Sequence, residues 1–87
     1  MYIILVYDIG EERVNRVLKI CRKYLTWIQN SVFEGDITEA NLIKLRHQLS
    51  KTIEKERDSV IFYILRTTAY MEKETIGAVK GEPTRII

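Results

Sequence analysis

Two short segments of the chain are apolar at nearly every position, and both are expected to be strands. Tyr2–Tyr7 and Ser59–Leu65 are rich in aromatic and β-branched residues, which favour β-structure. Both alternating faces of each segment are apolar, as is typical of a central strand that is covered on its two sides. Asp8 ends the first segment on the same face as Ile4 and Val6.

Two longer segments have the spacing of amphipathic helices. Residues 11–25 carry one apolar stripe at helical intervals, formed by Val14, Val17, Leu18, Cys21 and Leu25. Thr38 is the expected N-cap of a second helix that runs to about Glu54. Its apolar stripe consists of Leu42, Leu45, Leu49 and Ile53.

The remaining segments have weaker patterns. Thr26–Ile37 indicates either one bent strand or two short strands that meet near Asn30 and Ser31. Glu74–Val79 predicts a short strand, and Pro83 argues against regular structure after it.

This order of elements predicts an α+β fold, a ferredoxin-like βαββαβ sandwich with an extra C-terminal strand. Right-handed crossovers place both helices on one face of the sheet. The opposite face would expose the apolar side of two central strands, so we expect a homodimer packed sheet to sheet. Residues 1–87 form one domain, with a core over about residues 1–66. The C-terminal strand and tail, about residues 67–87, are expected to be exchanged with the dimer partner.

Composition bears on the oligomeric state and on the cellular location of the protein. The hydrophobic share of 46% is high for 87 residues, which agrees with an oligomer. Cys21 is the only cysteine, so an internal disulfide and a cysteine-based zinc site are excluded. The N-terminal apolar run is too short for a membrane span or a signal peptide. We therefore expect a cytoplasmic protein that does not bind membranes.

The exposed side of the first helix is basic although the net charge is only +2. Arg13, Arg16 and Lys19 are spaced by three residues and could follow a nucleic-acid backbone. A plain solvated helix face is the alternative. His47 is expected to be an ordinary surface residue.

Asp8 raises three alternatives, which are a solvated strand end, an N-cap of the first helix, and a functional site. Ser31 either closes a turn or donates to a phosphate, and the sequence alone favours the turn. Tyr7 and Phe33 could stack on bases, but strand aromatics are more often core or interface residues, and we favour the interface.

Four stretches resemble CRISPR-associated protein 2, the small adaptation subunit of CRISPR systems. They are YIILVYDI, ERVNRVLKICRKYL, WIQNSVFEGDIT and DSVIFYIL, which together span roughly residues 2–66. The most specific parts are SVFEG and the YD that ends the first strand. The chain departs from some members at Trp27, where they carry an arginine.

The resemblance implies a ferredoxin-like homodimer in which Asp8 lies near its symmetry mate. It implies metal-dependent nuclease activity on RNA or DNA, with Mg²⁺ or another divalent cation bound by Asp8 as metal ligand and catalytic residue. It also implies a role as the bridge of a complex with the CRISPR integrase subunit. The positions that match sites linked to this activity are Tyr7, Asp8, Arg13, Arg16, Ser31 and Phe33.

Three hypotheses follow. The first is a magnesium-dependent phosphodiesterase that acts on DNA or single-stranded RNA. The second is a dimeric adaptor that holds duplex DNA and the integrase without chemistry of its own. The third, a small-ligand or RNA-recognition domain, is weaker because SVIFYIL lacks the glycine and aromatic pattern of an RNA-recognition strand.

Overall fold

The computed structural model describes residues 1–78. Within them, a single five-stranded sheet has the order β2-β3-β1-β4-β5, and every neighbouring pair is antiparallel. The elements are β1 (Tyr2–Asp8), α1 (Glu11–Arg22), β2 (Thr26–Gln29), β3 (Val32–Asp36), α2 (Glu39–Thr52), β4 (Ser59–Thr67) and β5 (Tyr70–Gly77). This is the expected ferredoxin-like α+β order, and β1 is the central strand.

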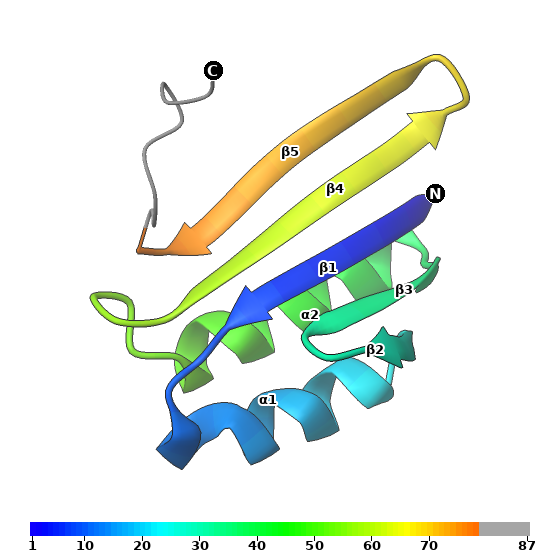
Figure 1. The fold of residues 1–87 in the computed structure, drawn as a ribbon. Helices are drawn as coiled ribbons and strands as arrows, with labels where there is room; N and C mark the ends of the chain where they lie inside the picture. The colour runs from blue at the N-terminus through cyan, green and yellow to red at the C-terminus, as the bar shows by residue number, and fades with distance from the viewer. Residues whose placement is uncertain (79–87) are drawn as a thin grey trace.

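Both helices lie on one side of the sheet (Figure 1). The core forms between them and the sheet, where Ile3, Leu5 and Phe62 are fully buried. The predicted stripe of α2 is confirmed, because Leu42, Leu45 and Leu49 are also fully buried there. In α1, Val17 and Cys21 form the buried part of the stripe.

The β2–β3 hairpin resolves the alternative that the sequence left open. Two short strands are present rather than one bent strand, and they are joined at Asn30 and Ser31. Asn30 has a φ of 43°, a left-handed conformation that asparagine tolerates better than most residues. The expected cap of α2 is also confirmed, since the Thr38 hydroxyl accepts from the Asn41 N–H at 3.1 Å.

The other side of the sheet, which we call the open face, has no helix over it in residues 1–78 (Figure 1). Its central rows consist of side chains that alternate with the buried core residues. They are Tyr2, Ile4 and Val6 of β1, Val32 of β3, and Ile61, Tyr63 and Leu65 of β4. All are only partly exposed in the single chain.

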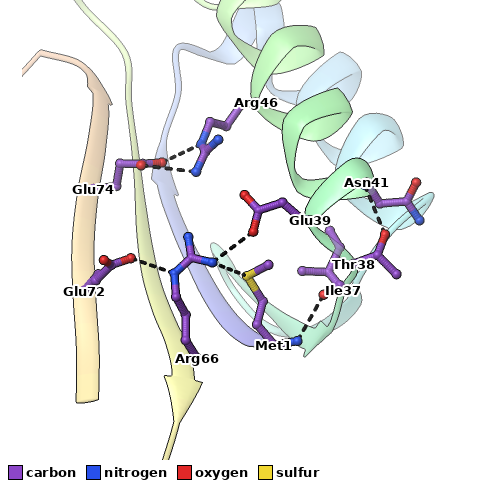
Figure 2. Close-up of polar contacts among 9 residues, drawn as sticks. All are labelled: Met1, Ile37, Thr38, Glu39, Asn41, Arg46, Arg66, Glu72 and Glu74. Atoms are coloured by element: carbon purple, nitrogen blue, oxygen red, sulfur yellow. Dashed lines mark hydrogen bonds and ion pairs between the residues drawn. The ribbon is translucent and has the colours of Figure 1, made fainter.

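Strand β5 begins four residues earlier than expected, at Tyr70, and pairs with β4 of the same chain. On its side toward the helices, two acids, Glu72 and Glu74, precede the apolar Ile76. Glu74 accepts from Arg46 of α2 at 2.6 and 3.2 Å. Arg66 of β4 donates to Glu72 at 3.0 Å and to Glu39 at 2.9 Å (Figure 2). Ion pairs thus attach the outer hairpin to α2.

Exchange of the C-terminal segment with a partner chain stays a prediction. Residues 79–87, which include the expected strand end at Val79 and the break at Pro83, lie outside the described residues. Neither helix in residues 1–78 is long and apolar enough to cross a membrane.

Candidate functional site at the Asp8 end of the sheet

Several chain segments meet where β1 ends. At this end of the sheet β4 begins, β5 ends and the β2–β3 hairpin turns (Figure 1). Asp8 pairs in register with Ser59, and the Tyr7 N–H donates to the Ser31 carbonyl at 3.1 Å. The sheet pairing of these residues explains why Tyr7, Asp8 and Ser31 come together although they are distant in sequence. We call this region the Asp8 end.

Asp8 is exposed and continues the row of Ile4 and Val6 on the open face, as the alternation predicted. It is not the cap of α1. Gly10 occupies the N-cap position, and no side chain there accepts a capping hydrogen bond. The capping alternative for Asp8 is therefore wrong, because helix α1 begins two residues too late for its carboxylate to cap it.

Tyr7 and Phe33 lie in the core beneath the helices. Phe33 is fully buried, Tyr7 is 6% exposed, and the two ring centroids are 6.2 Å apart. Burial raises the pKa of the Tyr7 phenol. The expectation of an interface position is therefore wrong for both rings, since they face α1 and α2 rather than the open face. A base contact by either ring stays a prediction and would require the ring to leave the core.

The basic side of α1 divides into two parts. Arg16 and Lys19 are exposed, as phosphate contacts would require. The Arg13 side chain is only 14% exposed, and its guanidinium donates to both carboxylate oxygens of Asp58, from Nε at 2.5 Å and from Nη2 at 2.9 Å. Of the three basic residues predicted to contact a nucleic acid, Arg13 is therefore already paired with a carboxylate of its own chain, Asp58.

Asp58 was not among the residues singled out in the sequence. Its side chain is fully buried in the loop between α2 and β4. The Arg13 guanidinium, with the N–H groups of Glu54 and Gly10, holds the pKa of the Asp58 carboxyl well below its usual range, against the opposing effect of burial. The available signal was an acid directly before an apolar strand, with an arginine near the start of the first helix.

Trp27 is the largest exposed aromatic side chain of the β2–β3 hairpin, with 50% of its surface accessible. Its indole N–H donates to the Asn30 carbonyl at 3.0 Å, which fixes the ring against the hairpin turn. Ser31 lies in that turn, which agrees with the turn function that the sequence favoured.

The cysteine and the histidine behave as expected. Cys21 is buried, and burial raises the pKa of its thiol to about 12. His47 is exposed on α2.

A metal ion would find few protein ligands among residues 1–78 of one chain. Across residues 1–78, no three histidine, cysteine or acidic side chains gather closely enough to hold one. At the Asp8 end, the exposed carboxylate of Asp8 is the candidate metal ligand. Mg²⁺ is commonly held by one or two carboxylates together with waters and substrate phosphates, so Asp8 fits that cation if a second copy or a nucleic acid completes the site.

Comparison with known sequences gives a consistent result. The sequence profile of the family described as "CRISPR associated protein Cas2" matches residues 1–73. The chain is 51% identical to "CRISPR-associated endoribonuclease Cas2" of Dictyoglomus turgidum over 87 residues, which cover 100% of both chains. It is 46% identical to the protein of the same name from Thermotoga maritima over 82 residues, 94% of each chain.

Solved structures agree with the sequences. One described as "Crystal structure of cas2" superposes with a TM-score of 0.74 at 43% identity, over 94% of this chain and 92% of the other. The Cas2 structure from Streptococcus pyogenes, determined at pH 6.5, gives a TM-score of 0.69 at 35% identity, over 75% and 86% of the two chains. The profile, the full-length relatives and the fold together show that this chain belongs to the CRISPR-associated protein Cas2 family.

Proposed function

We propose that this chain is a CRISPR-associated endonuclease that works as a homodimer, with Asp8 at its reaction centre and RNA as the first substrate to test. The observation that carries the proposal is the position of Asp8, an exposed carboxylate at the end of the central strand, on the open face of the sheet. The relatives named endoribonucleases support RNA as substrate.

The homodimer is supported by the open face. Its central rows are apolar across β1 and β4, and residues 1–78 provide no element that covers them. A contiguous apolar face of this kind is uncommon on a monomer, and a second copy related by a two-fold axis is the simplest cover. Because Asp8 continues the same row as Ile4 and Val6, packing of two open faces would bring two Asp8 carboxylates toward one interface.

The dimer also gives a reason for a divalent cation. Two carboxylates near one axis would repel each other unless a cation or protons lie between them. Mg²⁺ bound there would polarise a phosphate and lower the pKa of a bound water. The protein's own contribution would be to hold the carboxylates in place, while Arg16 and Lys19 on the exposed side of α1 attract the nucleic-acid backbone.

A second candidate is a non-catalytic adaptor that holds duplex DNA and the CRISPR integrase subunit during spacer acquisition. The observation that favours it is the sparse ligand set, since the described residues contain no group of three potential metal ligands. The exposed basic residues of α1 would serve this function equally well, because contacts with nucleic-acid phosphates position the DNA and do not require cleavage.

Cleavage assays separate the two candidates. Labelled single-stranded RNA and duplex DNA are incubated with the wild type and with Asp8→Asn, each with and without Mg²⁺. The nuclease proposal predicts magnesium-dependent cleavage that Asp8→Asn abolishes and that Asp36→Asn retains, since Asp36 is also an exposed aspartate but lies at the other end of the sheet, paired with Tyr2. Binding of DNA without cleavage by any of the three proteins would reject the nuclease and favour the adaptor.

A further inference from the structure

Asp58 holds together segments that are far apart in the sequence. The Gly10 N–H donates to its Oδ1 at 2.9 Å, and the Glu54 N–H donates to its Oδ2 at 2.9 Å. The Arg13 guanidinium binds the same two oxygens in a bidentate arrangement. A fully buried carboxylate with one cation and two backbone donors is well satisfied and geometrically specific.

These contacts fix the chain immediately after Asp8. Asp8 itself is held in the sheet through its register with Ser59, the residue that follows Asp58. Two residues beyond Asp8, the amide of Gly10 is held by the Asp58 carboxylate. The segment Asp8–Gly10 is therefore anchored at both ends by two consecutive residues of the β4 start.

Gly10 permits the ion pair to form. A Cβ atom at this position would collide with the end of the Arg13 guanidinium, so glycine leaves the path from Arg13 to Asp58 open. Gly10 also supplies no capping side chain to α1. The start of α1 is instead held by the Asp58 carboxylate, which accepts from the Gly10 N–H and from the Arg13 side chain.

The same aspartate fixes the end of β5. The Ala78 N–H donates to the Asp58 carbonyl at 2.9 Å. Gly77 has a φ of 95°, and an added Cβ would collide with that carbonyl oxygen. Only a glycine fits this close approach without strain. Asp58 thus joins three parts of the chain, namely the start of α1, the segment after α2 and the residue after β5.

We propose that Arg13 and Asp58 form a positioning pair that fixes the Asp8–Gly10 segment, and through it the Asp8 carboxylate. Arg13 then acts on the reaction through Asp58 rather than by contact with a nucleic-acid phosphate. The inference deepens the proposed function, because it rests on Asp8 as the reacting centre. The claim about the backbone can nevertheless be tested without any cleavage.

Arg13→Lys is the sharpest test. Lysine keeps the positive charge but cannot form the bidentate fork, so a phosphate contact would survive the change and the positioning pair would not. We expect the ¹⁵N order parameters of the Ile9 and Gly10 amides to fall from about 0.85 toward 0.6. We also expect kcat on RNA to fall about 10- to 100-fold, the size expected from a small misplacement, while KM stays near the wild-type value.

Arg46→Lys is the matched control. Arg46 also forms a bidentate pair with a carboxylate, Glu74, but on α2 and β5 (Figure 2). The two changes remove the same kind of contact, and only Arg13→Lys should affect Ile9 and Gly10. Gly77→Ala provides a second perturbation, because it displaces the Asp58 carbonyl without a change of charge. It should mobilise the same two amides.

The outcomes are distinct. Wild-type order at Ile9 and Gly10 in both Arg13→Lys and Gly77→Ala would overturn the positioning pair. Loss of order with an unchanged kcat would overturn it as well, since Asp8 would then not depend on the pair. If the wild type cleaves neither RNA nor DNA, the proposed nuclease function fails, and the order parameters alone decide whether Arg13 and Asp58 fix the segment.

Discussion

Replacement of Asp58 by alanine should be among the most destabilising single changes in this chain. The carboxylate is fully buried and accepts four hydrogen bonds, two from Arg13 and one each from the backbone of Gly10 and Glu54. Alanine removes the acceptor but leaves every donor in place. The change therefore creates unsatisfied N–H groups together with an Arg13 cation that has lost its buried partner and keeps only the exposed Glu12 carboxylate at 3.5 Å.

The magnitude follows from this geometry. Removal of one partner of a buried ion pair typically costs about 3–5 kcal/mol, because the other charge stays behind. A chain of 87 residues has a total stability of about 4–13 kcal/mol. The Asp58→Ala variant should thus lose about a quarter or more of its free energy of unfolding. For a domain of this size the loss corresponds to a fall in Tm of about 12–40 °C.

Thermal melts followed by circular dichroism, at one fixed protein concentration, measure this loss. Asp36→Ala is the control, because that aspartate is exposed and a surface change of this kind usually alters stability by less than about 0.5 kcal/mol. The reasoning would be refuted if Asp58→Ala melted as close to the wild type as Asp36→Ala does.

The pH dependence provides an independent check. The folded pKa of Asp58 is depressed, mainly by Arg13, so its charge stabilises the fold above the unfolded-state pKa of about 3.9. This contribution is lost as the pH falls below that value toward the folded pKa. The difference in Tm between the wild type and Asp58→Ala should be constant from pH 5 to 8 and should shrink below about pH 4. A difference that grew on acidification would contradict the assigned sign.

Four further predictions concern the site and the open face. Mg²⁺ should raise the Tm of the wild type but not of Asp8→Asn in melts from pH 4 to 8, and equal responses would argue against metal binding by Asp8. Arg16→Ala combined with Lys19→Ala should weaken binding to all sequences and reduce the salt slope by about one unit per lost phosphate contact, measured by fluorescence anisotropy. Tyr63→Lys should convert a dimer to monomer in sedimentation experiments, because it buries a charge in the apolar face, and an unchanged dimer would contradict that interface. Cys21 should resist iodoacetamide at pH 8 in the folded protein and react after unfolding, as followed by mass spectrometry, since its pKa is raised to about 12.

The parts of the fold that follow from local periodicity could be predicted from the sequence. The stripe Leu42, Leu45 and Leu49 has helical spacing, and all three side chains are fully buried. The alternation of Tyr2–Asp8 likewise placed Ile3 and Leu5 on one face and Asp8 on the other. Such patterns are reliable because side-chain direction within a helix or strand depends only on spacing.

The start of strand β5 was predicted four residues too late, at Glu74 rather than Tyr70, and the reason is physical. Its side toward α2 presents Glu72 and Glu74, where a buried strand would normally carry apolar residues. The acids are tolerated because Arg66 and Arg46 reach them from β4 and α2 (Figure 2). Only residues 70–73 were missed, and among them Glu72 is paired with Arg66 of the neighbouring strand, a contact that alternation along one segment does not indicate.

The same limit explains the interpretation of Arg13. From the sequence it belongs to a basic helix face with Arg16 and Lys19, because the three are spaced by three residues. Its partner Asp58 is 45 residues away, and the two meet only once β1 and β4 have paired. Charge spacing shows which side of a helix is basic, but it cannot show which of those charges is satisfied by the fold itself.

Asp58 lies in the loop directly before β4, and Asp8 pairs with the following residue, Ser59, but the two aspartates differ in exposure. Asp58 faces the core, where Arg13 and two backbone amides hold its charge. Asp8 faces the open side and is exposed in the single chain. If a second copy covers the open face, water is excluded beside Asp8, and the Asp8 charge becomes more costly, a cost that a bound cation would lower. Dimer formation and cation binding at Asp8 are therefore expected to be coupled, so that Mg²⁺ strengthens the dimer of the wild type more than that of Asp8→Asn.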